Sequence, residues 1–202
     1  MSLSDGYHIV PLGKVATIVT HLEMRAPVPP RPVQAPKGWH LRLVENPKPD
    51  WYRTLFHDVG SDWLWFSRLN MNDDALNAVI SHPDVSIWTL SNGSVDAALL
   101  ELDFKTQKEC ELSFFGLAPA LIGQGAGRFL MNAAIENAWA RPIELFKLQT
   151  CTLDSPQALP FYRRSGFTPT HQRIEIAQDP RQNGCLAIDK APHVPIFKTA
   201  ES

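Results

Sequence analysis

The chain has 202 residues, of which 44% are hydrophobic and 20% charged, proportions that are typical of a globular domain and exclude a disordered or fibrous chain. A formal net charge of −2 and a pI near 6.4 exclude an overall basic character, so the charge does not suggest nucleic acid as a partner. No stretch of about 18 consecutive apolar residues is present to span a bilayer, so we expect one domain and no membrane contact.

Cysteine and histidine residues give no sign of a disulfide framework or a metal site. Cys110, Cys151 and Cys185 are odd in number and lack CxxC spacing. The histidines show no ligand spacing either. We therefore expect no bound metal. The first residues also lack the pattern of a signal peptide, so we expect a cytoplasmic protein.

The first predicted element is a strand from Lys14 to Met24, where apolar and polar residues alternate as in a strand with one buried face. Its edge is free to pair within the chain or with a second copy. Five prolines between residues 26 and 38 remove amide donors and favour extended backbone, which indicates a stiff connector. We therefore expect residues 1–38 to form an N-terminal strand and connector packed on a main domain of residues 39–202.

A short strand, two helices and an antiparallel meander are expected next. Asp73 and Asp74 suit the start of the second helix, where the helix dipole favours negative charge. The Asn92-Gly93 pair can adopt the positive φ of a tight hairpin turn. The expected elements are a strand at 39–44, helices at 49–59 and 72–81, and strands at 85–90, 94–104 and 109–117.

The second half of the chain alternates helices and strands. Apolar residues cover a wide face of a helix at 125–141, which predicts packing against a sheet, and Pro142 ends it. A strand at 145–153, a short helix at 155–165, a strand at 167–176 and an irregular tail after Asp179 follow. This order predicts an α+β fold with a mixed sheet, in which the strands before and after the glycine-rich loop are parallel neighbours.

The glycine-rich turn from Gly123 to Gly127 joins a strand to a helix and predicts an anion site. The amides of the first helical turn are unpaired, and glycine lets a phosphate approach the backbone. Arg128-Phe129 stands where a P-loop requires Lys-Ser or Lys-Thr, and the GxGxG spacing differs from the GxGxxG of dinucleotide loops. The companion motifs of kinases are missing. A tight connection without a ligand is the alternative interpretation.

Two segments resemble motifs of the GNAT (Gcn5-related) N-acetyltransferase family. Leu117-Ala-Pro followed by Ile122-Gly-Gln-Gly-Ala-Gly-Arg-Phe-Leu130 is similar to the acyl-CoA motif of that family, and the segment from Ser155 to Phe167 is similar to its second motif. The resemblance covers roughly residues 39–176 and implies the GNAT fold, with the parallel pair of strands splayed at the acyl-CoA site. Ile122 replaces the usual Gln or Arg, and Ser155 the usual Asn, so phosphate binding would depend on backbone donors.

The resemblance implies an acetyl-CoA-dependent N-acetyltransferase that acts on a primary amine of a small molecule or peptide by direct transfer in a ternary complex. Glu111 matches the position of the general base in some members, and Tyr162 matches the general acid that protonates the departing thiolate. No metal takes part. The residues implied in cofactor binding are Phe115, Leu117, Ile122, Gly123, Gln124, Gly125, Ala126, Gly127, Arg128, Ser155 and Phe161.

The acceptor site is less well defined by the sequence. Trp63 and Trp65 lie in the region that walls the acceptor site of GNAT enzymes, although packing in the core is an equal alternative. Glu101 and Asp103 are alternatives to Glu111 as the base, or would hold a cationic substrate. Cys151 as an acyl-accepting nucleophile is disfavoured, because a strand cysteine of this kind is usually an inert buried thiol.

Two other functions stay open at the level of sequence. One is a non-catalytic GNAT-like module that binds and senses acyl-CoA, and the other is a nucleotide-binding protein that uses the same loop. The acceptor amine depends on helices and loops whose shape the sequence does not determine. We expect neither nucleic acid nor membrane as a partner, and a homodimer remains an option.

Overall fold

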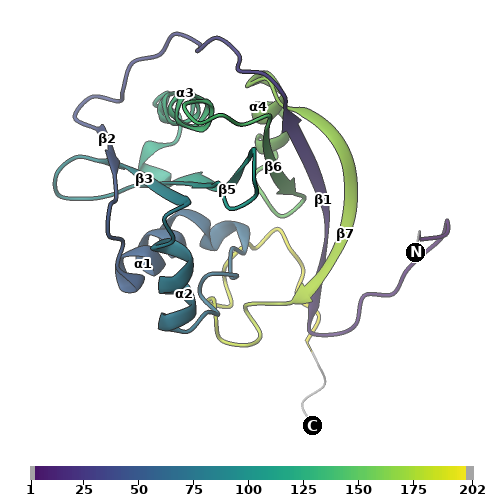
Figure 1. The fold of residues 1–202 in the computed structure, drawn as a ribbon. Helices are drawn as coiled ribbons and strands as arrows, with labels where there is room; N and C mark the ends of the chain where they lie inside the picture. The colour runs from purple at the N-terminus through teal and green to yellow at the C-terminus, as the bar shows by residue number, and fades with distance from the viewer. Residues whose placement is uncertain (1–2, 199–202) are drawn as a thin grey trace.

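A computed structural model describes residues 3–198, and it contains a seven-stranded mixed sheet in the order β2-β3-β4-β5-β6-β1-β7. Helices α3 and α4 lie on one face of the sheet, and α1 and α2 lie on the other (Figure 1). None of the helices in residues 3–198 combines the length and apolarity needed to cross a bilayer. The elements are β1 Lys14–Met24, β2 His40–Leu43, α1 Pro49–Gly60, α2 Asp73–Ile80, β3 Val85–Ser91, β4 Ala98–Asp103, β5 Glu109–Leu117, α3 Ala126–Trp139, β6 Leu145–Cys151, α4 Ala158–Arg164 and β7 Thr168–Gln178.

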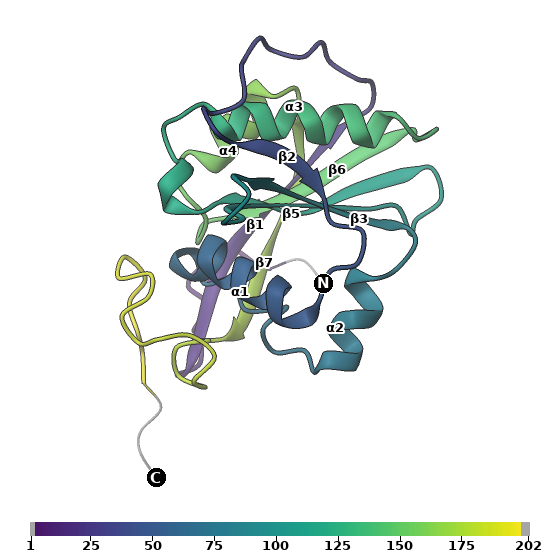
Figure 2. The ribbon, with the colours of Figure 1, turned by 90° about the vertical axis from the view of Figure 1, so that its left-hand side faces the viewer.

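Two apolar layers hold the helices to the sheet. Most of the predicted apolar face of α3 is buried against one face of the sheet, and Leu130 and Ala134 are 0% exposed. On the other face, Tyr52 and Phe56 of α1 pack with Leu76 of α2 and with the sheet. Figure 2 shows α3 lying across one side of the sheet and α1 and α2 below the other. This arrangement confirms the predicted α+β fold with a mixed sheet.

The N-terminal strand β1 is an interior strand of the sheet. It pairs antiparallel with β6, where Val19 faces Cys151, and with β7, where Thr17 faces Glu175 (Figure 1). Both of its edges are therefore occupied within the chain, and the free edge lies on β7. The sequence could not indicate this position, because the alternation of apolar and polar residues specifies which face of the strand is buried but not which strands pair with it. Residues 14–24 are thus an integral part of the main sheet.

The strands β5 and β6 are parallel neighbours, as predicted, but only over part of their length. Pairing runs from Glu109 opposite Leu145 to Leu112 opposite Leu148, and beyond this point each strand pairs only with its other neighbour. The register of β4 and β5 shifts between Glu101 and Leu102, which is the signature of a β-bulge and bends the strand. The sheet therefore opens between the second halves of β5 and β6.

The two element boundaries that differ most from the predictions are the starts of β4 and α4, where side chains bond to the local backbone. The hairpin after β3 is longer than a two-residue turn, since the Asn92 Oδ1 accepts hydrogen bonds from the amides of Ser94 and Val95. Consequently β4 begins at Ala98. Helix α4 begins at Ala158, because Ser155 forms a local turn in which its hydroxyl accepts from the Gln157 amide.

The segment after β7 has no helix or strand through residue 198, as predicted, yet it is held in place. The Arg181 guanidinium donates to both carboxylate oxygens of Asp179, at 2.9 and 2.8 Å, and the two side chains are each 1% exposed. It also donates to the carbonyl oxygens of residues 190, 191 and 194. Leu186 and Ala191 of this segment pack with Leu64 and Leu153. The segment thus packs against the residues that follow α1 and β6.

Candidate active site

A cleft of about 630 Å³ occupies the opening between β5 and β6. Its walls come from the second half of β5, the loop before α3, the start of α4, β1, β7 and the segment between α1 and α2. The lining residues used below are Val15, Thr17, Val19, Trp63, Leu64, Trp65, Phe115, Leu117, Ile122, Gly123, Gly127, Cys151, Asp154, Ser155, Phe161, Tyr162, Arg164 and Glu175.

The loop before α3 presents unpaired amide groups to the cleft. Gly123 and Gly125 have φ angles of 80° and 78°, which turn the backbone in a way that favours glycine. Between residues 3 and 198, no hydrogen-bond acceptor contacts the amides of residues 123–128, and the first helical bond runs from the Phe129 amide to the Gly125 carbonyl. Free amides at a helix N-terminus bind phosphate. The exposed Ile122 side chain adds no polar contact.

Tyr162 lies on α4, lines the cleft and is 8% exposed. Its ring packs edge-on against Phe115, Phe161 and Phe167, with ring centroids 6.1, 5.7 and 6.3 Å apart. Its hydroxyl makes no hydrogen bond to any residue in the described part of the chain. Burial raises the pKa of the phenol above its usual value, and the negative charge of Asp154 raises it further. The phenol therefore keeps its proton at neutral pH and can donate it.

Asp154 connects β6 to the wall of the cleft. Its Oδ2 accepts hydrogen bonds from the Thr150 hydroxyl at 2.8 Å and the Cys151 amide at 2.9 Å. Its Oδ1 accepts from the Trp65 indole Nε1 at 3.3 Å. The carboxylate is thus held beside Tyr162 while it faces the cleft. The sequence alone did not single out Asp154, although it directly precedes Ser155 of the second motif.

Trp65 closes the cleft because two glycines make room for its ring. A Cβ atom on Gly60 would lie 2.4 Å from the Trp65 ring, and one on Gly116 would lie 2.4 Å from Val59 and 3.1 Å from Trp65. The indole also contacts Phe114, with centroids 5.3 Å apart. Trp65 therefore spans the gap from the β5 side to Asp154 on the β6 side. Both predicted tryptophans, Trp63 and Trp65, line the cleft.

Glu111 does not line the cleft. It lies where β5 and β6 are still paired, opposite Lys147 on one side and Asp103 on the other. The bulge and the opening of the sheet begin after this point. The structure therefore does not bring Glu111 together with Tyr162, and the carboxylates that line the cleft are those of Asp154 and Glu175.

Glu101 and Asp103 are also separated from the cleft. Glu101 is 0% exposed, and its carboxylate accepts from the Tyr52 hydroxyl at 2.5 Å and from the Arg68 guanidinium at 2.6 Å. These partners lie in α1 and in the segment before α2, so Glu101 fastens that segment to the sheet. Asp103 pairs with Lys105 at 2.7 Å. Neither side chain is placed to hold a substrate in the cleft.

The remaining predicted residues divide between the cleft and its rim. Ser155, Phe161, Phe115 and Leu117 line it, as do Ile122, Gly123 and Gly127, whereas Gln124, Gly125, Ala126 and Arg128 do not. Gln124 instead donates to the Ala120 carbonyl at 2.6 Å. Cys151 also lines the cleft, but burial and then the charge of Asp154 raise the pKa of its thiol. A thiol that keeps its proton is a poor nucleophile.

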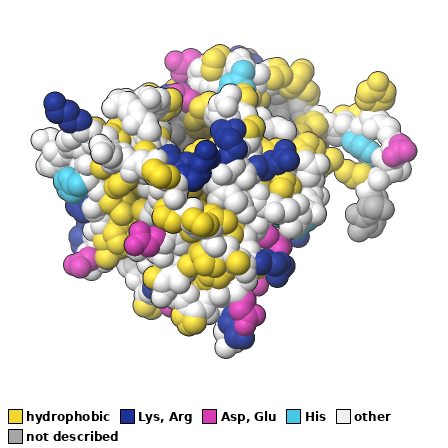
Figure 3. All heavy atoms as spheres, turned by 90° about the horizontal axis from the view of Figure 1, so that it is seen from above, with side chains coloured by type: hydrophobic (Ala, Val, Ile, Leu, Met, Phe, Trp, Pro, Cys, Tyr) yellow, Lys and Arg dark blue, Asp and Glu magenta, His cyan; other side chains and the backbone are white. Residues whose placement is uncertain are grey.

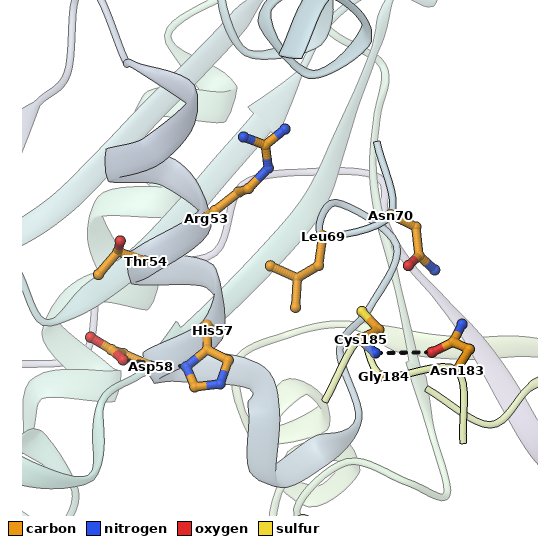
Figure 4. A pocket seen from close by; sticks show the side chains of 9 residues that line it. All are labelled: Arg53, Thr54, His57, Asp58, Leu69, Asn70, Asn183, Gly184 and Cys185. Carbon is orange, nitrogen blue, oxygen red and sulfur yellow. Dashed lines mark hydrogen bonds and ion pairs between the residues drawn. The ribbon is translucent and has the colours of Figure 1, made fainter. Parts of the chain in front are cut away.

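A second cavity, of about 510 Å³, lies outside the cleft between α1 and the C-terminal segment. Figure 4 shows its side chains spread around an open hollow. Arg53 is engaged by Asp73 at 2.7 Å, and the Cys185 amide by the Asn183 side chain. No group of three His, Cys, Asp or Glu side chains in residues 3–198 is placed to hold a metal ion. The unpaired amides and the buried phenol are in the cleft, which is therefore the candidate site.

Comparison with known proteins identifies a family. Residues 48–167 match the sequence model of the acetyltransferase (GNAT) family. The chain matches none of the curated proteins at a significant level.

Solved structures share the fold at low sequence identity. A GCN5-related N-acetyltransferase from Sphaerobacter thermophilus has a TM-score of 0.59 at 11% identity, over 98% of this chain and 56% of that one. An aminoglycoside acetyltransferase from an uncultured soil metagenomic sample has a TM-score of 0.55 at 13% identity, over 68% and 93%. A conserved protein of unknown function from Staphylococcus epidermidis has a TM-score of 0.53 at 15% identity, over 83% and 63%. The chain thus spans less than two thirds of the length of two of these structures.

Proposed function

The chain belongs to the GNAT acetyltransferase family, and from this premise we propose that it transfers an acetyl group from acetyl-CoA to a primary amine of a small molecule or peptide. The transfer is direct and takes place in a ternary complex. One observation carries the proposal: the loop of free amides at residues 123–128, which lines the cleft through Gly123 and Gly127, opens onto the same cleft as the phenol of Tyr162. The first suits the pyrophosphate of coenzyme A, and the second suits its leaving thiolate.

The donor fits the β5 side of the cleft. The amides of the loop would bind the pyrophosphate. The second half of β5 has no strand on its β6 side, so its backbone groups are available to the pantetheine arm and the thioester oxygen. Donors placed in this way stabilise the negative charge that develops on a carbonyl oxygen during acyl transfer. Phe115 and Phe161, whose ring centroids are 5.8 Å apart, pack beside the path to Tyr162.

The acceptor fits the part of the cleft lined by β1, β7 and the segment after α1, which is mainly apolar. Val15 and Val19 of β1 and Leu64 and Trp65 of the segment after α1 form its walls, and Glu175 of β7 adds a carboxylate. This surface suits an amine carried on an apolar or aromatic body, because apolar walls gain free energy when such a body excludes water. The acidic groups favour a cationic amine over a neutral one.

The chemistry needs a proton acceptor for the amine and a proton donor for the thiolate. The neutral amine nitrogen attacks the thioester carbonyl carbon, the carbon–sulfur bond breaks, and Tyr162 donates its proton to the thiolate sulfur. The nitrogen, which carries an extra proton after the attack, then returns one proton to the tyrosinate. A free alkyl amine with a pKa of about 10.4 is protonated at neutral pH and must first lose a proton. We assign this step to Asp154, which lines the cleft, in preference to Glu111, which does not.

A binding and turnover experiment tests the function. Acetyl-CoA is expected to raise the unfolding temperature, because a ligand present at 100 times its Kd stabilises by about 2.7 kcal/mol. A panel of amines with apolar and polar bodies is then screened by release of free thiol. Stabilisation by acetyl-CoA without any product would favour the sensing module. Stabilisation by ATP or NAD but not by acetyl-CoA would refute the proposal.

Asp154→Asn is expected to lower kcat/KM about 10²-fold or more, the usual effect of losing a general base. The asparagine keeps the shape of the side chain and one acceptor oxygen, which can serve either Trp65 or the pair Thr150 and Cys151. Glu111→Gln is the matched comparison and is expected to change kcat/KM by less than about threefold, because its side chain lies outside the cleft. Steady-state kinetics with the best amine measure both. A larger loss of kcat/KM in Glu111→Gln than in Asp154→Asn would assign the general base to Glu111 instead.

Trp65→Phe separates a positioning role of Asp154 from proton transfer. It removes the indole donor to Asp154 but keeps an aromatic ring between Gly60 and Gly116. If Asp154 only held Trp65, this variant would lose as much activity as Asp154→Asn.

A further inference from the structure

Four arginines gather beside the first turn of α3. Arg31 belongs to the connector, Arg128 to α3, and Arg163 and Arg164 to the last turn of α4. Together they line a small cavity of about 220 Å³. Figure 3, which views the molecule from above, shows Lys and Arg side chains gathered on the face that carries α3 and α4.

The positive charge of this cluster is not neutralised within the described part of the chain. No Asp or Glu side chain of residues 3–198 forms an ion pair with any of the four arginines. The contacts of Arg31 and Arg128 are neutral: Arg31 donates to the Arg164 carbonyl at 3.4 Å, and Arg128 donates to the Ser165 hydroxyl at 3.1 Å. Burial and then the charges of Arg31 and Arg164 lower the pKa of Arg128, which reflects the mutual repulsion. An anion would relieve this repulsion.

The connector is fixed in a way that keeps Arg31 at the cavity. The Asn132 side chain of α3 donates to the Arg31 carbonyl at 2.7 Å and accepts from its amide at 3.4 Å. Val28 rests on Gly166, where an added Cβ would lie 2.7 Å from it. Gly166 has a φ of 101°, so glycine is favoured there for a second reason. The cluster is therefore organised in advance of any ligand.

The cavity adjoins the candidate active site. Arg164 lines both the small cavity and the cleft. Arg128 lies over the ring of Phe161, 5.0 Å from its centroid, and Phe161 lines the cleft. Arg128 also directly follows the loop whose amides suit the pyrophosphate. A ligand that binds its pyrophosphate at the loop can therefore place a second phosphate among the arginines.

We propose that Arg31, Arg128 and Arg164 bind the 3′-phosphate of coenzyme A, and that the proline-rich connector supplies one wall of this phosphate site. The inference rests on the proposed function, in which the cleft binds acetyl-CoA. The 3′-phosphate is a monoester on the ribose adjoining the pyrophosphate, and arginine pairs with phosphate through charge-assisted, often bidentate, hydrogen bonds. The connector is thereby part of the donor site, in addition to linking β1 to β2.

The test compares coenzyme A with 3′-dephospho-coenzyme A by isothermal titration calorimetry, using the full chain. The wild-type protein is expected to bind coenzyme A at least about tenfold more tightly, the effect of one or more charge-assisted hydrogen bonds. In Arg31→Gln this ratio is expected to fall about fivefold or more, while the Kd for the dephospho form stays the same. Arg25→Gln is the control, because Arg25 is exposed, pairs with Glu23 and lies outside the cavity.

The outcomes separate this inference from the proposed function. Equal affinity for the two coenzymes in the wild-type protein, or an unchanged ratio in Arg31→Gln, would overturn the 3′-phosphate site while leaving acetyl-CoA as the donor. Binding of neither coenzyme would overturn both. An added arm with inorganic phosphate checks the source of the anion: competition with coenzyme A but not with its dephospho form supports the proposed site, and equal competition with both would overturn it.

Discussion

Replacing Tyr162 with phenylalanine is expected to lower kcat about 10²- to 10⁴-fold, the range associated with loss of a general acid. The substitution removes only the hydroxyl, and the ring can still pack against Phe115, Phe161 and Phe167. The unfolding temperature and the Kd for acetyl-CoA should therefore stay close to the wild-type values. Thiol release at saturating acetyl-CoA measures the effect. A wild-type kcat in this variant would remove Tyr162 from the mechanism.

The pH dependence of kcat provides a second check on Tyr162. Burial and the charge of Asp154 raise the pKa of the phenol, so it keeps its proton at pH values where an exposed tyrosine would lose it. Loss of the acid form must therefore begin above the usual value of about 10. We expect kcat to show no alkaline decline from this group between about pH 7 and 10. A decline that is present in the wild type in this range and absent from Tyr162→Phe would show that the pKa of Tyr162 is not raised.

Arg181→Met is expected to lower the free energy of unfolding by about 3–5 kcal/mol, because it leaves the Asp179 carboxylate buried without its partner. The methionine fills much of the volume but cannot bond to the carbonyl groups of the C-terminal segment. Urea denaturation followed by tryptophan fluorescence measures the change. The double variant with Asp179→Asn should regain part of the loss, since no charge is then left unpaired. A single variant as stable as the wild type would show that the pair does not hold the segment.

The same pair determines a pH dependence of stability. Burial by itself raises the pKa of Asp179, but hydrogen bonds from Arg181 and its charge outweigh this and lower it overall. A depressed pKa in the folded state contributes stability that is fully present above the unfolded value of about 3.9 and is lost as the pH falls through the folded value. The free energy of unfolding of Arg181→Met should not fall in this way at acid pH, because protonation stabilises a buried carboxyl group that has no cationic partner.

Local features of the fold were predictable from the sequence, and long-range ones were not. The bounds of β1 and β5, the helix after the glycines and the parallel pairing of β5 with β6 follow from alternation, spacing and chain order. Trp63, Trp65 and Tyr162 were also found, and they line the cleft. These predictions depend on a few neighbouring residues, or on motifs that keep their spacing.

The position of Glu111 could not be judged in the same way. Its distance from Tyr162 depends on a bulge after it and on where β5 and β6 separate, and neither feature has a clear signal in the sequence. Glu101 meets Arg68 only because α1 and the segment after it fold back over β4. Asp154 became a candidate for a similar reason, since its bond to Trp65 joins residues 89 positions apart.

The interior position of β1 has a consequence for synthesis of the chain. Thr17 and Thr152, whose hydroxyls lie 2.8 Å apart between β1 and β6, are separated by 135 residues. The strand β1 therefore leaves the ribosome before the strands with which it pairs. Synthesis of the intervening residues takes about ten seconds at the usual rate of translation. Contacts between such distant residues also slow folding. Since Val15, Thr17 and Val19 line the cleft, its acceptor part is completed only when the sheet closes, among the last steps of folding.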